Sequence, residues 1–263
     1  MRAAADRARI GWARGGSAAG AVLLPLAAWE LLSRAVLNAN LVPPPSVVAG
    51  VAAGMLWNGE LFAHTAISLR RIFVGFSLGS AIGITVGLAA ARSPLIWDAL
   101  RPLLAVCSTV PPIALIPLAM LWFGIDESAR LFLIVYLAAV LMIPSTVNGV
   151  RSIPAIRLRA AESLGARRSR IYLRVVLPDA LPSILSGLRI TLGFCFMVVV
   201  AAEMIGANSG IGYLIMQSRY YALTTKMFVG ILVLGVLGMG FDTIFRRLVA
   251  GLLPRFAVEK RTG

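Results

Sequence analysis

Long runs of apolar residues are the feature that most limits what this chain can fold into. Of its 263 residues, 59% are hydrophobic and 14% are charged, whereas a soluble domain has about 45–50% apolar and about 25% charged residues. The apolar residues gather in blocks, each close to the roughly 20 residues with which a helix crosses a bilayer. The sequence therefore predicts an all-α integral membrane protein.

Six of these blocks are long enough to be expected as transmembrane helices. They are approximately Ala18–Val36, Ile67–Ala91, Ile96–Phe123, Ala129–Val147, Ser183–Gly206 and Met227–Gly251. This pattern predicts one transmembrane domain over residues 18–251, between an N-terminal tail of residues 1–17 and a C-terminal tail of residues 252–263. A cleaved signal peptide is the alternative for the first block, but the block is long and no good small-residue cleavage site follows it.

The third block is the least regular, because three prolines interrupt it at Pro111, Pro112 and Pro117. Proline inside a membrane helix frees backbone carbonyls, which must then face protein or a water-lined path. A simple kink is an equally good interpretation. Because Ser108 and Thr109 lie beside the first two prolines, we predict that Ser108, Thr109, Pro111 and Pro112 line a polar path.

Acidic residues inside apolar blocks are also functional candidates, since a charge at the centre of a bilayer costs about 2.5–3.5 kcal/mol on insertion scales. Glu30 and Asp242 each have an arginine four residues later, so we expect local ion pairs there. Glu203, beside Met204 near the end of the fifth block, has no such neighbour. A role of Glu203 and Met204 at a gate or path and a role in packing both remain open.

The basic residues predict the orientation in the membrane. The net charge is +14, and 19 of the 25 Lys and Arg residues fall on one side if the N-terminus is inside. The positive-inside rule therefore places both termini in the cytoplasm. Nucleic-acid binding is a poor explanation of the charge, because no basic stripe interleaves with aromatic residues. The remaining six cations are Arg34, Arg70, Arg71, Arg130, Arg219 and Lys226.

The second block carries glycines at a strict spacing of four, namely Gly75, Gly79, Gly83 and Gly87. Residues four apart share one helix face, so these glycines form a groove that lets another backbone approach closely. Packing against a helix of the same chain is the favoured interpretation, and a contact between subunits is the alternative.

The connection from Arg151 to Pro182 is too long for a simple link between two helices. Ala160, Ala161 and Leu164 fall on one face of a short predicted helix, and Gly165 suits its C-terminal end, where a positive φ is easily adopted.

A second short helix is expected after this glycine, with Ile171 on its apolar side and arginines around it; Pro178 and Pro182 then mark the turn into the fifth block. Small apolar residues, a glycine break and a basic rim suit a knob that docks into a groove of a soluble partner. An ordinary basic loop is the alternative.

This pattern resembles the EAA loop of the permease subunits of binding-protein-dependent ABC importers. The matching residues are Ala160, Ala161, Gly165, Leu177 and Pro178, with Val175 in place of an isoleucine. The chain departs from the family pattern at Arg159, where a glutamate is usual, and Glu162 follows three residues later. Four further segments are similar to the nitrate, sulfonate and taurine branch: Leu121–Ile125, Asn148–Arg151, Ala202–Ala207 and Ser209–Ile215.

The resemblance implies a type I importer permease of the bacterial inner membrane, with two such subunits, expected to be identical, around a central path. A cytoplasmic ABC ATPase would bind ATP and Mg²⁺, so no cofactor is expected on this chain, and an extracytoplasmic binding protein would deliver a sulfonate, taurine or nitrate-like anion. The residues implied in ATPase coupling are Arg159, Ala160, Ala161, Glu162, Leu164, Gly165, Ile171, Leu177 and Pro178.

Enzymatic chemistry of the chain's own is not expected. Lys226 and Lys260 are its two lysines, and neither lies in a glycine-rich phosphate loop. Cys107, Cys195 and His64 lack metal-ligand spacing, so no metal site and no catalytic residue are predicted. The alternative functions are a secondary transporter driven by an ion gradient, which often shows two related halves, and a membrane-embedded enzyme.

Overall fold

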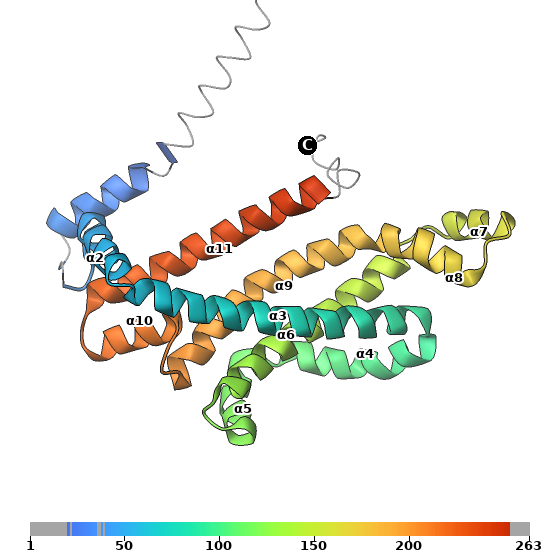
Figure 1. The fold of residues 1–263 in the computed structure, drawn as a ribbon, viewed down its shortest axis with the longest axis horizontal. Coiled ribbons are helices and arrows are strands. Elements are labelled where there is room, and N and C mark those ends of the chain that lie inside the picture. Colours follow the sequence, from blue (N-terminus) through green and yellow to red (C-terminus); the bar gives the residue numbers. More distant parts are fainter. Residues whose placement is uncertain (1–19, 22, 36–37, 39, 253–263) are drawn as a thin grey trace, which may run out of the picture. The chain divides into compact units, whose positions relative to one another are not determined.

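The computed structural model describes residues 20–21, 23–35, 38 and 40–252, and these residues form helices without any strand (Figure 1). In chain order the helices are α2 (Pro45–Trp57), α3 (Glu60–Arg92), α4 (Pro94–Thr109), α5 (Ile116–Phe123), α6 (Glu127–Arg151), α7 (Ala155–Ser163), α8 (Arg168–Ile171), α9 (Leu177–Gly206), α10 (Ile211–Tyr220) and α11 (Thr224–Leu252). A 3-10 turn, Pro112–Leu115, precedes α5, and a π-helical segment, Tyr172–Val176, joins α8 to α9. The predicted all-α class is confirmed.

Among the described residues, four helical segments are long and apolar enough to cross a membrane: Glu60–Arg92, Glu127–Arg151, Arg168–Gly206 and Thr224–Gly251. A fifth span results if the bent pair Pro94–Thr109 and Pro112–Phe123 counts as one. The first predicted span is helical over residues 20–21 and 23–35, but its ends, and both predicted tails except Leu252, lie outside the described residues. The count of six spans therefore stays a prediction.

The third span is broken where the sequence predicted an interruption. The pair of helices bends by 89°, and Val110 and Pro111 are both extended at the break. Pro117, in contrast, lies in the first turn of α5, where proline is tolerated because its missing N–H would have no partner. Two of the three prolines thus coincide with the break.

The fifth span begins earlier than predicted. Helical structure is continuous from Arg168 to Gly206 over 39 residues, so Pro178 and Pro182 do not mark a turn outside the span. Pro178 lies in the first turn of α9 and Pro182 lies inside the helix. Proline removes one hydrogen bond there without ending the helix, because neighbouring bonds and packing hold the backbone.

The chain divides into two compact units, one with the residues up to Phe62 and Leu214–Leu232, the other with Ala63–Tyr213 and the residues from Val233 onward. In the first unit, the Trp29 and Phe228 rings lie 5.8 Å apart, and the predicted local ion pair of Glu30 is present, with Arg34 Nε 2.6 Å from its carboxylate. The core of the second unit is built mainly by α6 and α9, which pack along one another.

The glycine groove of α3 lies against α6 within the second unit. A Cβ at Gly75 would lie 2.6 Å from the Ile134 side chain, and one at Gly87 would lie 2.7 Å from Thr146. Gly79 and Gly83 face Val135 and Met142 in the same way. The favoured prediction, packing against a helix of the same chain, is confirmed.

Candidate functional site

The connection between α6 and α9 begins with a helix that lies at the surface of the chain. None of the residues of α7 is buried, and Leu164, which caps the helix, is 87% exposed. The predicted face of Ala160, Ala161 and Leu164 is accordingly open, with Ala161 half-buried. An apolar helix face that is open to solvent in this way often marks a site of contact with another molecule.

A tight turn fixes the end of α7. Gly165 has φ +72°, a conformation that suits glycine. Its N–H donates to Glu162 O at 2.9 Å, and the N–H of Ala166 donates to Ala161 O at 3.2 Å. These two bonds are the pair that defines a Schellman motif. The predicted role of Gly165 as a helix terminator is confirmed, and the exposed loop has a defined shape.

The loop rejoins the membrane domain through α8. Ile171 is buried there, as its predicted place on the apolar side requires, whereas Leu177 is half-buried and Pro178 is exposed. Arg157 of α7 donates to Asp179 of α9 at 2.7 Å and ties the two helices together. Arg159 and Glu162, the residues at the departure from the family pattern, are both exposed.

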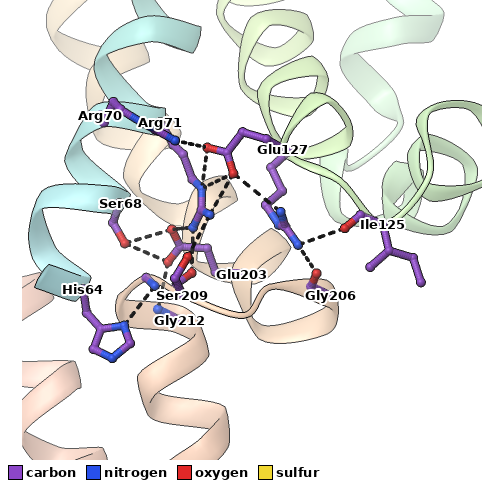
Figure 2. A network of polar contacts seen from close by, with 12 residues as sticks. His64, Ser68, Arg70, Arg71, Ile125, Glu127, Glu203, Gly206, Ser209 and Gly212 are labelled. Atoms are coloured by element: carbon purple, nitrogen blue, oxygen red, sulfur yellow. Dashed lines mark hydrogen bonds and ion pairs between the residues drawn. The ribbon is translucent and has the colours of Figure 1, made fainter. Parts of the chain in front are cut away.

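At the other end of the α6 and α9 pair lies an ion cluster, defined here as Ser68, Arg71, Glu127, Arg130 and Glu203, in which all but the half-buried Glu127 are buried (Figure 2). Arg71 is its centre, with a side chain 3% exposed. Its Nε and Nη2 donate to the Glu127 carboxylate at 2.9 and 2.8 Å, and its Nη1 donates to Glu203 at 2.7 Å. One guanidinium on α3 thereby joins the first residue of α6 to the last turns of α9.

The same cluster caps α10. Glu203 accepts from the backbone N–H of Gly212 at 2.9 Å, and Ser68 Oγ accepts from Ile211 N at 2.8 Å. His64 Nδ1 accepts from Gly210 N at 3.1 Å. The N-terminal amides of a helix have no intrahelical partner, so these three side chains satisfy them and fix where α10 begins. A Cβ at Gly210 would collide with the Glu203 carboxylate, which explains the glycine.

Arg130 is the least saturated member of the ion cluster. Its guanidinium contacts the Gly206 carbonyl, and Nη1 lies 3.6 Å from Glu127, while Nε is buried without a partner among the described residues. Next to it is a cavity of about 10 Å³, lined in part by Asp126 and Met120. A space of that size holds about one water molecule.

The sequence interpretation missed the ion cluster as a unit, although a signal for it was present. Glu203 and Arg71 are charges inside apolar segments without a local partner of the kind that Glu30 and Asp242 have. Charges in such segments almost always pair with one another. Asp242 keeps its predicted local partner, with Arg246 at 3.1 Å, and it also binds Arg189 of α9.

The predicted path residues divide between open and enclosed positions. Ser108 and Thr109 end α4 just before the 89° bend, are exposed, and donate to Ala105 O at 3.1 and 2.8 Å. Pro111 is exposed and Pro112 half-buried at the break itself. Glu203 has a side chain 0% exposed and Met204 is half-buried. The carboxylate of Glu203 therefore faces the cluster, which favours the packing role for it.

The fold defines a helical, multi-pass membrane protein with an exposed, well-ordered loop between α6 and α9. The model of the family "binding-protein-dependent transport system inner membrane component" matches residues 79–256. The chain belongs to this family and is a permease subunit of an ABC importer, which sets aside the gradient-driven alternative.

Similar proteins agree with this assignment. The chain is 35% identical to a Bacillus subtilis protein named aliphatic sulfonates transport permease protein SsuC, over 96% of this chain and 91% of that protein. It is also 35% identical to the taurine transport system permease protein TauC of Escherichia coli, over 86% and 84% of the two chains. A chain of the inward-facing MetNI methionine ABC transporter has the same fold, with a TM-score of 0.65 at 23% identity over 75% of this chain and 97% of that one.

Proposed function

We propose that two copies of this chain line the path of an ATP-driven importer, and that the loop around α7 and α8 couples the path to a separate cytoplasmic ATPase. The coupling residues are Arg159, Ala160, Ala161, Glu162, Leu164, Gly165, Ile171, Leu177 and Pro178. The observation that carries the proposal is α7, a helix with no buried residue that ends in a well-formed turn. The chain binds no cofactor itself, and ATP with Mg²⁺ is bound by the partner.

The cytoplasmic side of the membrane is the proposed place of this loop. Both termini then lie in the cytoplasm, as the distribution of Lys and Arg supports. The cations on the outer side differ from those of the loop, because most of them have acidic partners: Arg34 pairs with Glu30, Arg70 and Arg71 with Glu127, and Lys226 with Glu60.

A small oxyanion is the proposed solute, received from an extracytoplasmic binding protein. Relatives named for aliphatic sulfonates and taurine support a sulfonate, with a nitrate-like anion as the alternative. Ser108, Thr109, Pro111 and Pro112 are the proposed path residues, since they lie at the broken span. If cysteines introduced at Ser108 and Thr109 do not react with small thiol reagents in any nucleotide state, this assignment is contradicted.

Purification of the tagged chain from its native membranes in mild detergent tests the coupling role. Mass spectrometry is expected to find an ATPase in roughly equal amount, and Gly165→Val is expected to lose it while the chain still inserts. Gly235→Val is the matched control, because a Cβ at Gly235, on α11, would have no atom within 4 Å. Equal ATPase recovery from wild type and Gly165→Val would remove the role of the loop.

A further inference from the structure

A cavity of about 220 Å³ lies in the first unit, where α10 ends and α11 begins. Its lining includes Glu60, Gln217, Ser218, Tyr221, Leu223 and Lys226. The space holds several water molecules, so a small organic molecule fits. Neither the coupling loop nor the ion cluster contributes a residue to it.

One positive and one negative side chain face each other in this cavity. Lys226 Nζ donates to the two carboxylate oxygens of Glu60 at 2.9 and 3.1 Å. The two side chains are half-buried, 33% and 28% exposed, so water reaches the pair and screens it, and its contribution to stability is about 1 kcal/mol. An ammonium has three donors and a carboxylate about four acceptor sites, so both groups retain capacity for a ligand.

Two neutral polar side chains line the cavity beside this ion pair. The Ser218 residue is 2% exposed and lines the cavity, but its hydroxyl is not among the fully enclosed polar atoms that lack a partner in the described part of the chain. The half-buried Gln217, one residue earlier, lines the cavity as well. Water or a polar molecule in the cavity can therefore bond to both side chains.

The turn that closes the cavity is held in a costly conformation. Ala222 has φ +55°, the one positive φ of a non-glycine residue in the described ranges. Its N–H donates to Arg219 O and that of Leu223 to Ser218 O, as in the turn after α7, but without the glycine. A left-handed alanine costs roughly 1–2 kcal/mol. This turn sets Tyr221 and Leu223 against the cavity.

We propose that this cavity binds a small zwitterion, with its oxyanion on Lys226 and its primary ammonium on Glu60. Ser218 and Gln217 donate to the oxyanion, and the ligand takes the place of the direct Lys226–Glu60 bonds. Two molecules share this chemistry: a free amino-sulfonate such as taurine, in which case the inference rests on the proposed function, and the headgroup of phosphatidylethanolamine.

Equilibrium binding of two matched probes tests the site. The permease, purified with its bound subunits, is placed in nanodiscs of phosphatidylcholine and phosphatidylglycerol and titrated with taurine and with ethanesulfonate, which lacks the amine. Taurine is expected to bind about tenfold more tightly, since a hydrogen bond to a charged group is lost with ethanesulfonate. Glu60→Gln is expected to abolish this preference, and Lys226→Met to abolish binding of both probes.

The lipid arm uses nanodiscs that contain phosphatidylethanolamine and counts retained molecules by native mass spectrometry. Retention by the wild type, lost in Glu60→Gln and Lys226→Met, would identify the headgroup as the ligand. Arg219→Met is the matched control, because Arg219 is an exposed cation of α10 that does not line the cavity.

The proposal is overturned if neither taurine binding nor lipid retention separates the Glu60 and Lys226 variants from Arg219→Met. A double variant, Glu60→Lys with Lys226→Glu, keeps an ion pair. If the double variant regains the melting temperature that the single variants lose, and no zwitterion binds even to the wild type, the ion pair has only a stabilising role between the helices. ATPase recovery is measured on the same preparation, so a failure of the proposed function is seen separately.

Discussion

The two ends of the α6 and α9 pair differ in how completely the chain satisfies its own polar and apolar groups. At the end with Glu127 and Glu203, the Arg71 guanidinium is enclosed and bonded to both carboxylates. At the end with Arg151 and Leu177, the intervening helix α7 has no buried residue. The same two helices thus carry an enclosed region that stabilises the fold and an open region that we propose to contact the ATPase. The difference predicts opposite responses to substitution.

Arg71→Met is expected to have the largest effect on stability. It leaves two carboxylates without their main partner, and breaking a buried ion pair costs about 3–5 kcal/mol. Denaturant or thermal unfolding in detergent measures the loss. Arg70→Met is the control, because Arg70 binds the same Glu127 at 3.0 Å but is 66% exposed, and it should cost less than about 1 kcal/mol. Equal losses for both variants would contradict the distinction between buried and open pairs.

Gly79→Ala is expected to have the next largest effect. The new methyl group would overlap the Val135 carbonyl and lie 2.7 Å from Ala138 Cβ, and overpacking of this kind costs about 1–3 kcal/mol. Gly235→Ala is the comparison, since nothing lies within 4 Å of that position on α11. It should leave stability unchanged or raise it by up to about 1 kcal/mol. The same unfolding assay serves both.

Ala222→Gly is expected to stabilise the fold slightly. Glycine adopts the left-handed conformation of this turn without the steric cost that alanine bears, although it gains more entropy on unfolding. The expected net gain is about 0.5–1 kcal/mol, which a rise in melting temperature would report. A fall in melting temperature would mean that the Ala222 methyl group makes contacts that outweigh the strain.

Leu164→Asp is expected to have the smallest effect on stability and the largest on transport. Leu164 is 87% exposed, and surface substitutions usually stay within about 0.5 kcal/mol. Uptake of radiolabelled taurine, one of the proposed solutes, into proteoliposomes with ATP should nevertheless fall to background. Leu173→Asp is a comparison at another exposed leucine of the same connection. Normal uptake by Leu164→Asp would show that this face does not contact the ATPase.

The features that follow from local sequence were predictable. The helical class follows from the long apolar blocks, the break in the third span from Pro111, and the turn at Gly165 from its position after a short helix. The partner of the glycine groove was also predicted as a helix of the same chain. Each of these depends on residues that are close in sequence or on a simple spacing rule.

The features that depend on distant contacts were not predictable from one sequence. Arg71 and Glu203 are separated by 132 residues, and no local rule says which of several charges will meet. The start of α9 was misplaced because Pro182 is normally read as a helix boundary, whereas here the helix continues through it. The cavity at Lys226 is formed by the ends of three helices, so it can be recognised only when the positions of those helices in space are known.

The order in which the ion cluster can form has a consequence for biosynthesis. Glu127, the first acidic residue of the ion cluster to be synthesised, follows Arg71 by 56 residues. At a synthesis rate of about 5–20 residues per second, roughly 3–11 s pass between the two residues. During that time α3 must cross or wait at the membrane with its arginine unneutralised. The Arg71 side chain therefore lacks both of its carboxylate partners for the whole interval between synthesis of α3 and synthesis of α6.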